Sequence, residues 1–138
     1  MSHPAKWLLL VGLTGCLEAE VLHEVALSGA VHSDQAGPVE LWFMHSRWGD
    51  GDLETSNMVF DSNWLDDAGE FTCVVQVPQT AGEGLSVYGW QDVDGDGEHC
   101  RPGSAPEPSG IVEGLAYPTH ELEIELELVW TCEGPDGP

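Results

Sequence analysis

The chain has 138 residues, a length typical of one domain. Asp and Glu number 25 against 3 Lys and Arg, and the formal net charge is −22. Nucleic acids and anionic lipid surfaces are bound by clustered cations. This composition therefore argues against a nucleic-acid partner and against direct docking on a membrane surface.

The amino-terminal segment predicts export. A single lysine, Lys6, precedes the short apolar run at residues 7–13, and small residues follow that run. This order is typical of a secretory signal. The run is shorter than the about 20 residues that a transmembrane helix needs. We therefore expect residues 1–15 to form a signal peptide.

Leu13-Thr14-Gly15-Cys16 resembles the lipobox of bacterial lipoproteins at all four positions. The resemblance implies cleavage before Cys16 and lipidation of its thiol, which would supply the membrane anchor of an exported protein. Leu17 favours the outer membrane, because lipoproteins held at the inner membrane often carry Asp there. Residues 16–24 would then form a lipidated tether. The alternative is an ordinary cleaved signal, with Cys16 in a disulfide.

We expect residues 25–132 to form one β domain. Short β-forming stretches are separated by Gly-, Pro- and Asp-rich turns, and no convincing helical period is present. We expect strands at residues 25–32, 39–45, 57–64, 70–77, 85–91, 111–115 and 119–130. About seven such strands indicate an all-β fold, an antiparallel β-sandwich that resembles immunoglobulin-like or transthyretin-like modules in strand count only. Residues 133–138 should form a disordered tail.

The last predicted strand alternates between carboxylates and apolar side chains. Its charged members are Glu121, Glu123, Glu125 and Glu127, and its apolar members are Leu122, Ile124, Leu126 and Leu128. Because side chains on a strand alternate between its two faces, we expect the apolar set in the core and the glutamates in solvent. The glutamates would then be a solvated face that discourages edge pairing. The alternative is an acidic surface for cations or a basic partner.

The strongest chemical motif follows the strand predicted at residues 85–91. Asp92, Asp94 and Asp96 alternate and are followed by Gly97, which resembles the first six positions of an EF-hand calcium loop. The resemblance ends there, because the twelfth position, where a bidentate Glu belongs, is Gly103 and no flanking helices are evident. We therefore predict a Ca²⁺ loop between two strands rather than an EF-hand.

Two further residues complete the predicted calcium site. Glu107 is the next carboxylate that a curled loop could bring back, and Glu98, through its backbone carbonyl, could join it together with water. The alternative is a polar turn, in which Asp and Gly serve only the backbone conformation. His99 and Cys100 beside the loop leave a zinc or copper site as a weaker alternative.

The expected export to an oxidising location makes a disulfide the default fate of the cysteines. With Cys16 set aside for lipid, Cys73, Cys100 and Cys132 remain, an odd number. If neighbouring strands are antiparallel, the strands at 85–91 and 119–130 finish at the same end of the sandwich. A Cys100–Cys132 disulfide is then expected, with Cys73 as a buried free thiol. Pairing of Cys73 with either partner stays open.

The sequence favours a non-enzymatic binding or structural module at the cell envelope. It carries no phosphate loop or cofactor fingerprint, and His32 and Ser33 are merely adjacent, which does not build a catalytic triad. The alternative is a surface carbohydrate-binding or adhesion module, in which an exposed Trp stacks on sugar rings. Trp48, in a Gly- and Asp-rich loop, is the candidate for that contact. Trp42 and Trp90 are expected on a second covered face.

Overall fold

A computed structural model describes residues 21–47, 56–78, 85–103 and 105–132. The predictions about the signal peptide, the lipidated Cys16, the Trp48 contact and the tail at residues 133–138 lie outside these ranges. No helix among the described residues is long and apolar enough to cross a membrane.

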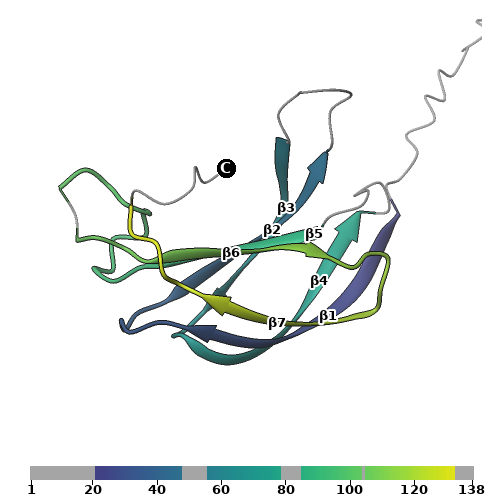
Figure 1. Ribbon diagram of the computed structural model, residues 1–138, viewed down its shortest axis with the longest axis horizontal. Coiled ribbons are helices and arrows are strands. Elements are labelled where there is room, and N and C mark those ends of the chain that lie inside the picture. The colour runs from purple at the N-terminus through teal and green to yellow at the C-terminus, as the bar shows by residue number, and fades with distance from the viewer. Residues whose placement is uncertain (1–20, 48–55, 79–84, 104, 133–138) are drawn as a thin grey trace, which may run out of the picture.

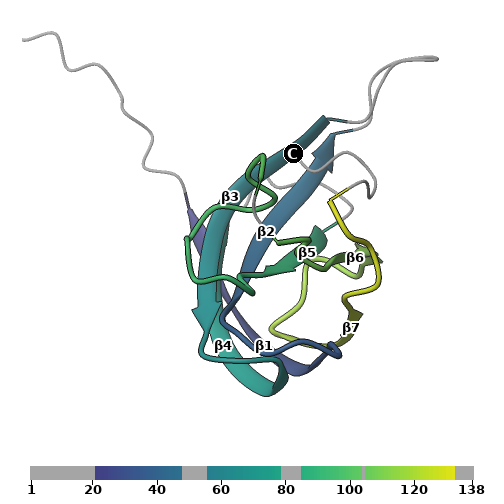
Figure 2. The same cartoon turned by 90° about the vertical axis from the view of Figure 1, so that its left-hand side faces the viewer.

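Within the described ranges, seven strands form two facing sheets (Figures 1 and 2). The strands are β1 (Leu22–His32), β2 (Val39–Arg47), β3 (Ser56–Leu65), β4 (Gly69–Pro78), β5 (Leu85–Gln91), β6 (Ser109–Leu115) and β7 (Glu121–Glu127). The smaller sheet has the order β4-β1-β7, and the larger has the order β3-β2-β5-β6. The prediction of an all-β sandwich of about seven strands is confirmed.

One strand pair departs from the antiparallel expectation. β7 pairs with β1 in parallel, whereas the other four ladders between the described strands are antiparallel. The reason is that β7 enters the smaller sheet from β6 of the larger one, so a crossover between sheets sets its direction instead of a hairpin. β1 also begins at Leu22, before the predicted start of the domain at Val25.

The last strand is shorter than the predicted range 119–130, because the chain changes sheets after Glu127. Leu128 still donates from its backbone to the carbonyl of His32 (2.9 Å), but Trp130 already pairs with Ser109 of β6. The backbone of β7 passes so close to β6 that a Cβ on Gly110 would lie 2.0 Å from the carbonyl oxygen of Glu127. This crossing carries Cys132 toward the loop between β5 and β6.

The main core lies between the sheets, and the alternation predicted for the last strand is confirmed. Ile124, Leu126 and Leu128 are buried and Leu122 is partly buried against the core, while the four glutamates of β7 are exposed. We call Glu121, Glu123, Glu125 and Glu127 the acidic stripe.

The outer face of the larger sheet carries a second apolar cluster. Met44, Tyr88 and Trp90 are buried there, with Trp42 and Ile111 packed against them. His99, from the loop between β5 and β6, packs on Trp90 with 5.1 Å between ring centroids. Consistent with cover on both faces, every residue of β5 is buried. The expected second covered face for Trp42 and Trp90 is therefore present.

Candidate metal centre

The candidate site is built in the loop at residues 92–108, which joins β5 to β6 at one end of the sandwich (Figure 1). Backbone hydrogen bonds hold its base: Gln91 donates to the carbonyl of Pro108 (3.0 Å), and Asp92 donates to that of Pro38 (2.8 Å). The side chain of Gln91 is fully buried and donates to the carbonyl of Gly37 (2.9 Å). The loop therefore starts and ends on a fixed platform.

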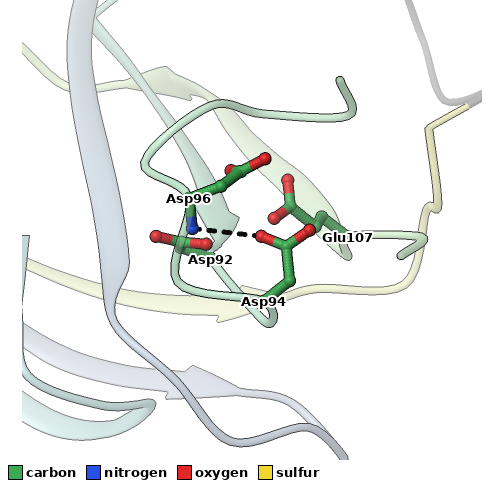
Figure 3. A group of neighbouring side chains, drawn as sticks. All are labelled: Asp92, Asp94, Asp96 and Glu107. Atoms are coloured by element: carbon green, nitrogen blue, oxygen red, sulfur yellow. Dashed lines mark hydrogen bonds between the residues drawn. The ribbon is translucent and has the colours of Figure 1, made fainter. Parts of the chain in front are cut away.

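Four carboxylates converge inside this loop, and Figure 3 shows them pointing toward one another. They are Asp92, Asp94, Asp96 and Glu107, which we call the acidic cluster. Each offers one oxygen, and these oxygens all lie within 4.8 Å of one another. The cluster holds the four residues whose carboxylates were predicted from the sequence as ligands. Glu98, which was predicted to contribute its backbone carbonyl, uses its side chain in an ion pair with Arg101 (3.5 Å).

Local backbone chemistry explains how the three aspartates are arranged. The two carboxylate oxygens of Asp92 accept hydrogen bonds from the backbone of Gly95 (2.8 Å) and Gly97 (2.9 Å). Asp94 accepts from the backbone of Asp96 (3.2 Å), as Figure 3 shows. Gly95 and Gly97 have φ of +76° and +74°, a left-handed conformation that glycine adopts at little cost. These bonds alone would also fit a polar turn.

Glu107 is the feature that a polar turn does not explain. Its side chain has no exposed surface, and its Oε2 accepts a hydrogen bond from the backbone N–H of Cys100 (2.8 Å). Its Oε1 is buried and has no hydrogen-bond partner within the part of the chain that the structure describes. An unpaired buried carboxylate oxygen is costly, and a cation bound by this oxygen would offset that cost.

The electrostatics of the acidic cluster agree with this. Burial raises the pKa of Glu107; the Cys100 N–H opposes the shift, and the negative charges of Asp94, Asp92 and Asp96 add to it. For Asp94, burial also acts to raise the pKa, but hydrogen bonds with Asp96, the Ala105 backbone and Asp92 lower it overall. The neighbouring negative charges thus oppose ionisation of Glu107, and a bound cation would offset this repulsion.

A disulfide joins Cys100, in the middle of the loop, to Cys132 beyond β7, with 5.4 Å between their Cα atoms. The predicted pairing is confirmed. Cys73 is free and half-buried. Burial raises the pKa of its thiol, with Asn63 lowering and Asp61 raising it, so the thiol is a weak nucleophile. Because Cys100 is oxidised it offers no thiolate, which removes the basis of the zinc or copper alternative.

Comparison with protein-family models, curated proteins and solved structures gives no match. The acidic cluster, with the buried and unpaired Glu107 oxygen, is therefore the observation on which a functional assignment depends.

Proposed function

We propose that this protein is a non-enzymatic β-sandwich module of the bacterial cell envelope, exported and lipid-anchored through Cys16, in which Ca²⁺ stabilises the loop at residues 92–108. The observation that carries the calcium part is the buried, unpaired Oε1 of Glu107 beside three converging aspartates. The anchor rests on the lipobox resemblance, and the non-enzymatic role rests on the sequence, which carries no phosphate loop or cofactor fingerprint.

Calcium fits this donor set better than other common ions. The cluster offers only carboxylate oxygens, which hard cations prefer. Because Ca²⁺ binds oxygens at about 2.3–2.6 Å, two ligands on opposite sides of the ion are about 4.6–5.2 Å apart. Oxygens within 4.8 Å of one another can share such an ion. Mg²⁺ is less suited, because it usually keeps several waters and uses one or two carboxylates.

The proposed role of the cation is to hold the loop in shape. Asp92, Asp94, Asp96 and Glu107 would hold it, with water and the carbonyl of Glu98 available to complete the shell. The loop carries His99 onto Trp90, so a stable loop keeps the second apolar cluster covered. Extracellular sites with dissociation constants of about 10⁻⁴–10⁻³ M serve in this way without switching.

Calcium titration by calorimetry, together with thermal melting, tests the site. We expect binding and a higher melting temperature for the native chain, and loss of both in Asp94→Asn/Asp96→Asn. Glu121→Gln/Glu123→Gln is the matched control, because it removes the same charge from the exposed acidic stripe and should keep the response. An equal loss in the control would show a diffuse counterion effect and contradict the assignment.

The anchor is tested separately in a bacterial host. The native chain should incorporate labelled fatty acid and sediment with outer membranes, and Cys16→Ser should do neither. Unchanged membrane association of Cys16→Ser would overturn the lipid anchor but leave the calcium site untouched.

A second candidate function, carbohydrate binding, has one observation in its favour. Trp64 lies on the outer face of β3 with 46% of its surface exposed, and its ring packs edge-on against Trp90 (5.5 Å between centroids). Such a ring could stack on a sugar. A glycan-array screen of the native chain, Trp64→Ala and Trp48→Ala tests it. Binding that neither variant weakens would contradict a Trp-based site.

A further inference from the structure

Resting on the proposed calcium site, we propose that the Cys100–Cys132 disulfide controls the affinity of that site, so that the loop binds Ca²⁺ tightly only when the disulfide is formed. The disulfide and the acidic cluster are connected through one residue. The backbone of Cys100 and the cluster both contact the carboxylate of Glu107.

Glu107 connects the disulfide to the acidic cluster. Its Oε2 accepts the hydrogen bond from the backbone of Cys100, its Oε1 has no hydrogen-bond partner among the described residues, and the same carboxylate supplies an oxygen to the acidic cluster. The Cys100 Sγ also lies 3.7 Å from the Glu107 carbonyl oxygen. Whatever holds Cys100 in place therefore orients the one ligand that comes from the far end of the loop.

The other end of the disulfide is anchored next to Glu107 as well. Ser109, two residues beyond Glu107, exchanges two backbone hydrogen bonds with Trp130 (2.7 and 3.0 Å), and Cys132 follows Trp130 by two residues. These contacts thus form a small closed ring, which runs from Glu107 through Ser109, Trp130, Cys132 and Cys100 back to Glu107. The disulfide is its covalent link between the loop and the segment after β7.

The backbone conformation of Cys100 indicates which constraint would be lost if the disulfide were reduced. Cys100 has φ of +54°, a left-handed conformation that non-glycine residues rarely adopt. Without the disulfide, Cys100 can return to a more favourable conformation and take its N–H away from Glu107. Glu107 would then be buried beside three carboxylates without a fixed orientation, and the cation would lose a preorganised ligand.

The chemical step is a thiol–disulfide exchange with a dithiol as the two-electron reductant. One thiolate of the dithiol attacks a sulfur of the pair and forms a mixed disulfide, and the other protein sulfur leaves as a thiolate. The second thiol of the dithiol then closes its own disulfide, and Cys100 and Cys132 end as two protonated thiols. By linkage, the factor by which reduction weakens calcium binding equals the factor by which calcium disfavours reduction.

The experiment uses the full chain carrying Cys16→Ser, so that Cys73 is the only additional thiol. Calcium affinity is measured by calorimetry on the oxidised chain, on the chain kept reduced by dithiothreitol, and on Cys132→Ala. The reduction potential is then measured in dithiothreitol buffers with Ca²⁺ or with Mg²⁺ at matched ionic strength. Circular dichroism reports whether each form keeps its β structure.

We expect the reduced chain and Cys132→Ala to bind Ca²⁺ at least about tenfold more weakly than the oxidised chain. Calcium should then lower the reduction potential by about 30 mV, the equivalent of that factor for a two-electron couple. The shift should disappear in Asp94→Asn/Asp96→Asn. Equal affinity in both redox forms, or a shift that persists in that variant, would overturn the coupling alone. No calcium binding by either form would overturn the proposed function too.

If the reduced forms lose their β structure, the potential of the native pair with and without Ca²⁺ still decides the matter. A potential that calcium does not change, in an oxidised chain that binds calcium, would contradict the coupling.

Discussion

The acidic cluster and the acidic stripe each contain four carboxylates, but the fold uses them in opposite ways. On β7, alternate residues project from one face about 7 Å apart and remain in water, so their charges repel weakly. In the loop at residues 92–108, two of the four are buried and all four converge within 4.8 Å. The number of negative charges therefore does not make a cation site. Convergence and burial do.

The largest expected effect is a loss of folding stability, because a carboxylate of the acidic cluster accepts backbone hydrogen bonds. Asp92→Ala removes a buried carboxylate that accepts two backbone N–H bonds, so the free energy of unfolding should fall by about 2–4 kcal/mol. Glu123→Ala, on the exposed stripe, should change it by less than about 0.5 kcal/mol. Urea unfolding with and without Ca²⁺ measures both. Similar losses in the two variants would remove the distinction.

A second comparison asks how removing one negative charge changes the melting temperature and the calcium affinity. Glu107→Gln removes one charge from a crowded buried group, so the calcium-free protein should melt at a higher temperature while its calcium affinity falls by about tenfold or more. Glu121→Gln removes an exposed charge and should change neither quantity appreciably. Melting curves at several calcium concentrations test the prediction, and an unchanged calcium response of Glu107→Gln would contradict it.

Backbone conformation provides a third comparison. Gly97 and Gly114 both have left-handed φ, +74° and +67°, and an added Cβ would meet nothing within 4 Å at either position. Alanine at each should cost about 1–2 kcal/mol of stability. Only Gly97→Ala should also weaken calcium binding, because Gly97 donates to Asp92. Calorimetry that finds the same calcium affinity in both variants would exclude a role of this turn in the site.

The smallest expected effect is a pH dependence of stability at the acidic stripe. A hydrogen bond with Glu125 raises the pKa of His32, burial opposes the shift, and the charges of Glu127 and Glu125 add to the increase. A raised histidine pKa contributes stability that is present below the ordinary value of 6.5 and is lost as the pH rises through the folded-state pKa. His32→Gln should abolish this small pH dependence of the melting temperature, and Glu125→Gln should reduce it. Persistence of the dependence in both would assign it to other groups.

Much of the fold could be predicted because strand periodicity is a local property. The alternation from Glu121 to Leu128 indicated which face is buried, and Leu85 to Gln91 form a strand with the predicted bounds. The parallel pairing of β7 with β1 was not predictable in the same way. It depends on a crossover between sheets, which neither strand records in its own residues.

The candidate site, like the fold, could be predicted only in part from the sequence. Asp92, Asp94 and Asp96 could be selected by their spacing, and Glu107 by being the next carboxylate within reach. That Glu98 would pair with Arg101, and that the backbone N–H of Cys100 would hold Glu107, had no signal in the sequence. Backbone groups look alike in every residue, so only the folded path of the chain decides which of them meet.

The sequence by itself determined the β periodicity, the acidic character of the chain and the three alternating aspartates, because these depend on residue types at short spacing. The tertiary structure decided that Glu107 is buried with one oxygen unpaired, and that the disulfide joins the loop beside it to the segment after β7. The disulfide depends on the crossing of β7 toward β6, a contact between segments far apart in the chain. Burial and convergence are properties of such contacts, and these turn an acidic loop into a candidate metal centre.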